Sequence, residues 1–189
     1  MYEHIEPLDR GDRYEDPLQA ALEAAGAGEV TGGGSLLGED GRIEFADVEI
    51  AVADLGPALD LVISTLERAG APAGSAILVG DEVVREFGTQ QCLAIHLDGV
   101  SLPDEVYAEL DFDQVVADIE SLAGEDSYRG FWQGPEETGI FFFGPDAEEM
   151  FARVEPKLRE LPIGQNARVV IRDGRESLHP RTVRIPRHA

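Results

Sequence analysis

The stretch TGIFFFGPDAEEMFARVEPKLRELPIGQNARVVIRDG, residues 138–174, sets the interpretation of the whole chain. Its apolar run Ile140–Phe143 predicts a strand, and Gly144-Pro145 marks the turn that ends this strand. Apolar residues then recur at the three- and four-residue spacing of a helix: Met150, Phe151, Val154 and Leu158. Because Ala167–Arg172 again reads as a strand, the stretch predicts a strand–helix–strand unit.

An earlier stretch, residues 48–81, has the same order of signals. A strand at Val48–Ala53 is followed by the turn Gly56-Pro57, by a helix that ends near Ala69, and by a strand at Ser75–Val79. The two stretches share few identical residues but have glycines and prolines at matched places. We therefore interpret the chain as two copies of one unit.

Extended in both directions, each copy reads β-α-β-β-α-β, with first strands at Tyr2–Glu6 and Cys92–Asp98. This order resembles the ferredoxin-like fold, a resemblance that implies an antiparallel sheet with two helices on one face and no particular activity. We predict an α+β protein made of tandem ferredoxin-like repeats packed as one pseudo-symmetric domain. Residues 1–81 form the first unit, and residues 82–189 form the second unit with a basic C-terminal tail.

Several strands of the second copy are apolar on both faces. Ile140–Phe143 and the pair Phe131-Trp132 place large side chains on each side of the predicted sheet. One face packs under the helices, and the other needs a cover because soluble monomers rarely expose a large apolar patch. The cover is either the first copy or a partner, which includes a second copy of the chain, so a monomer and a homodimer both stay open.

The charge is strongly negative. Thirty-eight acidic residues face 15 basic ones, which gives a formal net charge of −23. Such a field repels nucleic acid and anionic membranes and attracts basic proteins, so we expect a basic protein partner, no nucleic acid and no membrane. The alternative is that the acidity is a general property of the proteins of its host. The single cysteine, Cys92, and the lack of an apolar leader predict a cytoplasmic protein.

Basic residues gather at the C-terminal end of the sequence. The arginines of this segment are Arg168, Arg172, Arg175, Arg181, Arg184 and Arg187. We expect the tail to lie back on the acidic body as an edge strand. The alternative is a basic arm that reaches an anionic partner.

Two short patterns place a histidine and a carboxylate on one side of a strand: His4 with Glu6, and His96 with Asp98. Brought together, these four side chains would suit a divalent metal, whereas the simpler interpretation is two strand histidines beside acids. We predict no metal and no cofactor. Cys92 is expected to be a small core residue.

Acidic side chains also follow one another along a predicted strand at Glu44, Asp47 and Glu49. They form a solvated strip or, with His96 beside Asp47 or Glu49, the acid–base pair of a hydrolase. The glycines of Thr31–Ser35 precede another strand and not a helix, which predicts a bulge or a close backbone approach instead of a phosphate cradle.

An aromatic residue lies beside an acidic loop in Trp132–Glu137, a combination typical of protein interfaces. The alternative is a core tryptophan at a hairpin end. We predict the following partner-binding residues: Trp132, Gln133, Glu136, Glu137, Asp47 and Glu49.

The function that this pattern favours is a non-enzymatic acidic binding protein, for instance an immunity or inhibitor protein that caps a basic toxin or nuclease. A module that senses a ligand or metal between the two units is the second hypothesis. A hydrolase that uses His96 with Asp47 or Glu49 is the third.

Overall fold

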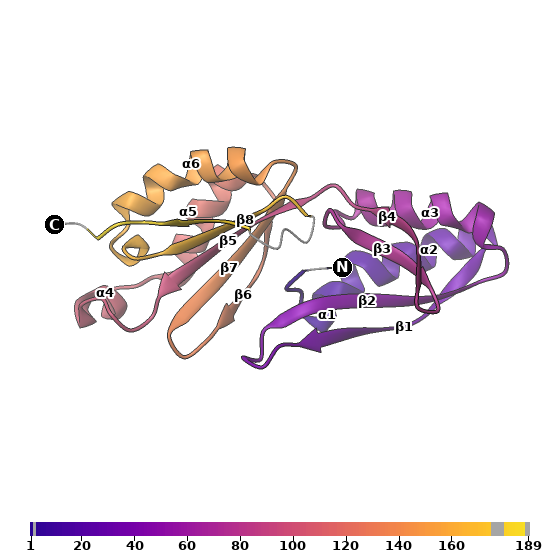
Figure 1. Cartoon of the computed structure of the whole chain (residues 1–189), viewed down its shortest axis with the longest axis horizontal. Coiled ribbons are helices and arrows are strands. Elements are labelled where there is room, and N and C mark those ends of the chain that lie inside the picture. The colour runs from indigo at the N-terminus through magenta and orange to yellow at the C-terminus, as the bar shows by residue number, and fades with distance from the viewer. Residues whose placement is uncertain (2, 175–179, 188–189) are drawn as a thin grey trace. The chain divides into compact units, whose positions relative to one another are not determined.

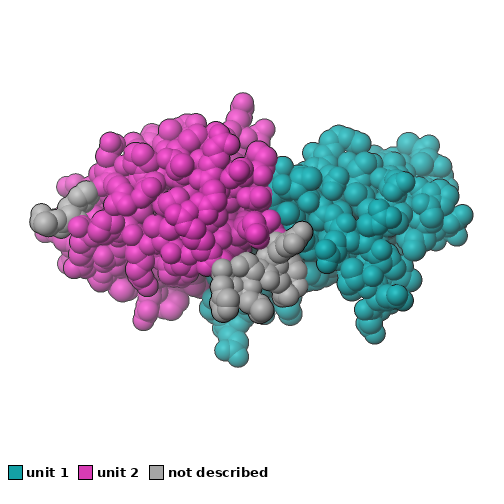
Figure 2. All heavy atoms as spheres, turned by 45° about the horizontal axis from the view of Figure 1, so that its top comes forward, with its two compact units in different colours: residues 1–90 teal, residues 91–189 magenta. Residues whose placement is uncertain are grey.

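The computed structural model describes residues 1, 3–174 and 180–187. The chain is α+β with antiparallel sheets, and it divides into two compact units, Met1–Gln90 and Gln91–Ala189, which Figure 2 colours separately. The division falls later than the expected boundary after residue 81. That boundary lies inside a hairpin, because β3 (Ser75–Val79) pairs with β4 (Glu82–Phe87). Each unit is described below by itself.

The second unit contains one five-stranded sheet in the order β6-β7-β5-β8-β9 (Figure 1). Its strands are β5 (Gln91–Asp98), β6 (Tyr128–Gln133), β7 (Glu137–Gly144), β8 (Arg168–Arg172) and β9 (Arg181–Arg184). The central strand β5 pairs antiparallel with both β7 and β8. The tail forms the expected edge strand, β9, which pairs with β8. Arg181 of β9 forms an ion pair with Glu148. Arg175 lies outside the described residues.

The helical elements of the second unit are α4 (Asp104–Ala108), α5 (Phe112–Ala123), α6 (Ala147–Glu160) and the 3-10 turn η2 (Pro162–Gly164). An aspartate begins each long helix: Asp111 accepts from the Gln114 amide at 3.0 Å, and Asp146 accepts from the Glu149 amide at 2.9 Å. These caps satisfy amides that have no partner within the helix. Pro156 lies inside α6, which runs as one helix from Ala147 to Glu160.

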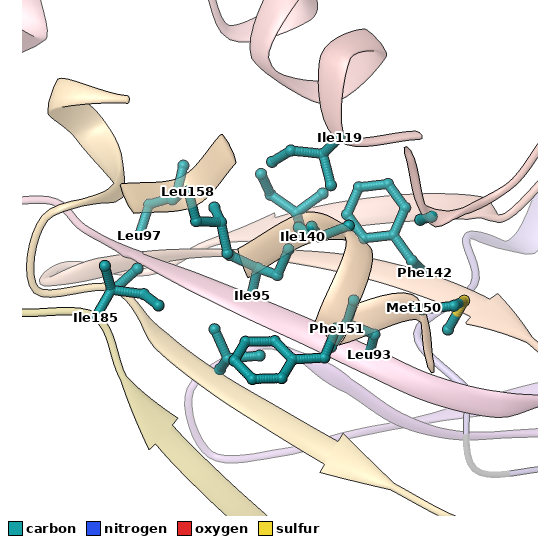
Figure 3. Close-up of a cluster of buried hydrophobic side chains, with 14 of the residues drawn as sticks. Leu93, Ile95, Leu97, Ile119, Ile140, Phe142, Met150, Phe151, Leu158 and Ile185 are labelled. Carbon is teal, nitrogen blue, oxygen red and sulfur yellow. The ribbon is translucent and has the colours of Figure 1, made fainter. Parts of the chain in front are cut away.

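Alternate residues of β5 form the centre of the second unit's core. Leu93, Ile95 and Leu97 point toward α5 and α6, where they pack with residues such as Ile119 and Leu158 (Figure 3). Burial of each such side chain stabilises the fold by about 1.5 to 3 kcal/mol. The residues between them face the other way, and a second buried cluster contains Cys92, Ala94, Phe141, Phe143 and Val170.

The described part of the first unit has two separate two-stranded sheets, β1-β2 and β3-β4. Its elements are α1 (Pro7–Arg10), the π-helical turn η1 (Gly11–Glu15), α2 (Asp16–Ala25), β1 (Gly28–Leu37), β2 (Ile43–Val52), α3 (Leu55–Arg68), β3 and β4. β1 pairs with β2, and a register shift at Thr31 provides the bulge expected in the glycine-rich stretch.

The strand expected at Tyr2–Glu6 is absent from the described part of this segment, residues 1 and 3–6. Met1 lies along β2: its amine donates to the Ala46 carbonyl at 2.8 Å, and the Ala46 amide donates to the Met1 carbonyl at 2.9 Å. The chain then enters α1 at Pro7, a residue favoured at the first position of a helix. The β-α-β-β-α-β order predicted for residues 1–81 is thus corrected, since its first strand is not formed.

The first unit's core lies between its helices and strands. Tyr14, Leu18 and Leu22 pack with Val62 and Leu66 of α3. The Tyr14 hydroxyl donates to the Glu3 carboxylate at 2.6 Å, which holds the N-terminal segment on the helices. Among the described residues of either unit, no helix is both long and apolar enough to cross a membrane.

Candidate functional site

The first unit contains a cavity of about 560 Å³. The strands β2 and β3 both contribute residues to the walls of this cavity. The lining residues are Met1, Leu18, Thr31, Phe45, Ala46, Asp47, Val48, Glu49, Ile50, Val62, Leu66, Ala76, Ile77, Leu78, Gly80 and Phe87. This volume is in the range of ordinary ligand sites.

The cavity lies at the edges of the two strands and not above one face of a sheet. Successive residues of a strand point to opposite faces. A cavity over one face would therefore touch alternate residues, but consecutive residues of β2 (45–50) and of β3 (76–78) line this one. It consequently occupies the plane in which another strand would pair with β2.

One side of the cavity is apolar. Leu18 of α2 and Val62 and Leu66 of α3 line it and belong to the unit's core cluster, and Val48 and Ile50 of β2 pack against that cluster. An apolar group placed here would extend the existing core, so the side facing the helices favours aliphatic or aromatic ligand groups.

Acidic side chains line the opposite side. Asp47 and Glu49 point away from the face of β2 that carries Val48 and Ile50. Asp47 lies against Gly34: a Cβ atom on Gly34 would be 2.9 Å from Asp47 Oδ1, so the carboxylate would have to move. The lining residues, all of them described, include no lysine, arginine or histidine. The cavity therefore favours basic ligands and disfavours anionic ones.

Trp132, the aromatic residue predicted to bind a partner, packs on its own hairpin. Its ring covers Gly134, where a Cβ atom would lie only 2.1 Å from the indole, and it contacts the cluster that contains Cys92. The Gly134 amide donates to the Glu137 carbonyl at 2.9 Å and closes the turn. Gln133 and Glu136 are exposed on this hairpin.

Phe131 is the exposed aromatic residue of the same strand. It is 46% exposed and meets Phe112 of α5 edge to face, with ring centroids 5.1 Å apart. The sequence pattern placed Phe131 and Trp132 on opposite faces of the strand and left open what covers the face away from the helices.

Glu137 is engaged within the second unit. Its carboxylate accepts a hydrogen bond from Arg168 of β8 and lies 3.0 Å from Nδ1 of His96 on β5. His96 is buried opposite Gly139 and meets the edge of Phe141, with ring centroids 6.2 Å apart. These contacts connect three neighbouring strands, and they give Glu137 and His96 a role in holding the sheet.

Asp98 closes the loop after β5 and is not paired with His96. It accepts hydrogen bonds from the Val100 and Ser101 amides at 3.0 and 2.8 Å, from the Ser101 hydroxyl, and from the Asn166 side chain at 3.0 Å. Burial raises the pKa of Asp98, but these donors outweigh burial and hold its pKa well below the usual range.

The four residues considered as metal ligands fall into different units. His4 lies 3.9 Å from Glu6 in the first unit, and His96 and Asp98 belong to the second. Across the part of the chain that the structure describes, no group of three or more histidines, cysteines or acids is placed to hold a metal ion. Asp47 and Glu49, proposed as acid–base partners of His96, lie in the first unit and line its cavity.

Comparison with known proteins gives no relative of this chain. No family model matches it, and no curated protein or solved structure gives a significant match. The cavity of the first unit, with its apolar side and its two carboxylates, is therefore the feature on which a function can be argued.

Proposed function

We propose that this chain is a non-enzymatic acidic binding protein for a basic polypeptide, and that the cavity of the first unit is its recognition site. The observation that carries the proposal is the combination in one cavity of an apolar side with Asp47 and Glu49, without a lining lysine, arginine or histidine. A formal net charge of −23 supports it, because a field of one sign speeds encounter with a partner of the other.

An immunity or inhibitor protein for a basic toxin or nuclease is the concrete form of this proposal. For such proteins, charge opposite to that of the partner raises the association rate and the selectivity, while buried apolar contacts stabilise the complex. The exposed side chains of Gln133, Glu136 and Phe131 on the second unit supply a further contact surface in this scheme. In this scheme Glu137 and Trp132 support that hairpin from within.

The proposal includes a common origin for the two units in a ferredoxin-like module. Its support is the shared order helix, hairpin, helix, strand in α2-β1-β2-α3-β3 and α5-β6-β7-α6-β8. Further support is the aspartate that begins the second helix in each, Asp54 with the Gly56 amide at 3.0 Å and Asp146 with the Glu149 amide at 2.9 Å.

A ligand-sensing module is the second candidate, and the cavity's volume favours it, because small molecules occupy sites of this size. A thermal-shift screen of apolar amines and divalent cations separates it from the first, since a ligand selective for the native state raises its melting temperature. The third candidate is a hydrolase that uses His96 with Asp47 or Glu49. The described geometry gives it no support within either unit, because His96 belongs to the second unit and both carboxylates belong to the first.

The test uses a random displayed peptide library selected against the full chain. We expect enrichment of basic peptides, whose association rate falls as salt increases from low to physiological ionic strength. Enrichment of acidic and basic peptides alike, or association rates that salt leaves unchanged, would reject the proposal.

Matched variants locate the site. The double variant Asp47→Asn with Glu49→Gln removes two charges at the cavity, and Glu125→Gln with Glu160→Gln removes two exposed charges from the second unit. We expect the cavity variant to slow association by about three- to tenfold and the control to change it by less than about twofold. Equal effects would mean that total charge alone attracts the peptide.

A further inference from the structure

The hairpin β1–β2 of the first unit is longer than the hairpin β6–β7 of the second. Its strands have ten residues each, whereas β6 has six and β7 has eight. In Figure 1 the two long strands lie side by side as a ribbon, with the turn between them at one end. Both hairpins connect one helix to the next in the same order, so this order does not account for the extra length. Connecting segments that exceed what a fold needs are common places for binding residues.

Two large apolar side chains at the turn end of this ribbon are exposed. Leu36 is 60% exposed and Leu37 is 61% exposed. Leu36 pairs with Phe45 of β2, and the next residue pairs with Ile43. Because neighbouring residues of a strand point to opposite faces, the ribbon presents one exposed leucine on each face. A flat partner surface would cover only one of them, whereas a cleft with two walls would cover both.

Acidic side chains surround the two leucines. Residues 36–44 contain three acids, Glu39, Asp40 and Glu44, and one base, Arg42, which gives this segment a formal charge of −2. All three acids are exposed. The carboxylates of Asp40 and Glu44 lie beside Gly38, where a Cβ atom would be 3.1 and 2.7 Å from their oxygens. A cleft lined by lysine or arginine would complement this charge, whereas a second copy of the chain, itself at −23, would be repelled.

Hydrogen bonds hold the turn in one shape. The Gly38 amide donates to the Arg42 carbonyl at 2.8 Å, and the Gly41 amide donates to the Gly38 carbonyl at 3.0 Å. The Arg42 amide donates to the Asp40 carboxylate at 3.0 Å. Gly41 has a φ of 77°, a left-handed conformation that glycine adopts without strain. A turn that is fixed before binding loses little conformational entropy when it enters a partner, which favours affinity.

We propose that the turn end of this hairpin, residues 36–44, inserts into a cleft of the basic protein partner. The acidic turn would meet cationic residues on the floor of the cleft, and Leu36 and Leu37 would pack against its two walls. The inference rests on the proposed function. It adds a second contact element beside the cavity and specifies the shape of the partner surface, which is a concave site on a folded protein.

A cleft of this kind has the chemistry of a site for a polyanion. Lysine and arginine side chains that line such a cleft bind the phosphate groups of nucleic acid. An acidic hairpin seated there would occupy the same cations and exclude the nucleic acid. In the form of the proposal in which the partner is a basic nuclease, residues 36–44 are therefore the inhibitory element.

The experiment selects binders of the full chain from two displayed libraries of one folded, arginine-rich scaffold protein. One library varies the residues that line a cleft of the scaffold, and the other varies residues on a flat face, at equal net charge. We expect the cleft library to give binders that depend on residues 36–44. Affinities and association rates of purified binders are measured by surface plasmon resonance.

A pair of matched variants tests the leucines. Leu36→Ser with Leu37→Ser should weaken the cleft binders at least about tenfold, because two apolar contacts are lost. Val79→Ser with Val83→Ser removes two other exposed apolar side chains of the first unit and should change binding by less than about twofold. All four positions are exposed, so the melting temperature of both variants should match that of the wild type.

A second pair of variants tests the charge. Glu39→Gln with Glu44→Gln should slow association of the same binders by about three- to tenfold. The control Glu125→Gln with Glu160→Gln removes two exposed charges from the second unit and should change the rate by less than about twofold. The charge variant keeps both leucines, so it decides the question if the leucine variant lowers the melting temperature.

Each other outcome has a specific meaning. Binders that the hairpin variants leave unaffected, but that Asp47→Asn with Glu49→Gln weakens, would overturn insertion and leave the cavity as the recognition site. Flat-face binders that depend equally on the two leucines would also overturn it, since no cleft would be needed. Absence of binders from both libraries, together with failure of the basic peptides, would reject the proposed function itself. A doubled mass in solution that the leucine variant halves would assign this end of the hairpin to a second copy of the chain.

Discussion

The two units differ chiefly in one strand. In the second unit β5 pairs on both sides and joins five strands into one sheet, whereas the described first unit keeps two hairpins apart. The main core cluster of the second unit holds twenty buried residues, and that of the first holds ten. Since the helices and hairpins follow the same order in both, the comparison shows how much of the packing depends on the central strand.

Among the described residues, the hairpin β3–β4 forms a sheet of two strands only. Its exposed large apolar side chains are Leu78, Val79, Val83 and Val84. A two-stranded hairpin is marginally stable without a third strand or a covering helix. We therefore expect the first unit to be the less stable of the two, and a ligand in its cavity to stabilise it.

The largest expected effect is on the free energy of unfolding and comes from replacing one isoleucine with alanine in each unit. Ile140 is fully buried on β7, and Ile50 is partly buried on β2 beside the cavity. Ile140→Ala should lower the free energy of unfolding of the second unit by about 2 to 5 kcal/mol. Ile50→Ala should lower that of the first unit by less than half as much, because it removes fewer contacts.

Denaturant unfolding followed by fluorescence of Trp132, the single tryptophan, reports the second unit, and amide exchange reports the first. Equal losses for the two variants would mean that β2 is packed as closely as β7. The proposed ligand cavity beside β2 would then be untenable.

Local signals predicted most helices and hairpins of the fold. Aspartate, glycine and proline mark the starts of α3 and α6, and the apolar spacing of Met150, Val154 and Leu158 marks the buried face of α6. The missing first strand could not be predicted in this way. Tyr2–Glu6 alternates well enough for a strand, but strand formation depends on pairing with distant residues, which a local pattern does not show.

The second expected effect concerns the turns of the equivalent hairpins β6–β7 and β1–β2. A Cβ atom on Gly134 would collide with the Trp132 ring, whereas one on Gly38 would meet the ends of two side chains, Glu44 at 2.7 Å and Asp40 at 3.1 Å. Gly134→Ala should therefore destabilise the second unit by about 1 to 3 kcal/mol and alter Trp132 fluorescence. Gly38→Ala is the matched control and should be nearly neutral in thermal unfolding.

The candidate site was predictable in part. Asp47 and Glu49 were recognised as acids along one strand, but their place beside a cavity depends on how β2, β3 and the helices pack together, which no local pattern reveals. The contacts of Glu137 with Arg168 and His96 depend on the register of three strands. Register is set by pairing across the sheet, so the acidic loop was predicted as a free binding surface.

The third effect tests the loop that follows β5 and has no counterpart in the first unit. Asp98→Asn should destabilise the second unit by about 1 to 2 kcal/mol at neutral pH, because hydrogen bonds to a carboxylate are weakened. The pKa of Asp98 is lowered in the folded state, so its contribution is present above the ordinary carboxyl pKa and is lost as pH falls below about 4. Unfolding measured from pH 7 to pH 3 should show the wild type and variant converging. A constant difference would mean that charge is irrelevant there.

The smallest effect concerns the helices that cover the closed sheet. Lys157 Nζ of α6 lies 2.7 Å from Asp118 Oδ2 of α5, and this hydrogen bond holds the pKa of Asp118 below its usual value. Lys157→Met should return that pKa toward the ordinary range, as measured by carbon NMR titration, with little change in stability because the pair is on the surface. Arg159→Met removes a pair with Glu155 within α6 and is the control, which should leave Asp118 unchanged. If Lys157→Met also left Asp118 unchanged, α5 and α6 would not be held together at this point, and the cohesion of the second unit would depend on β5 and the core alone.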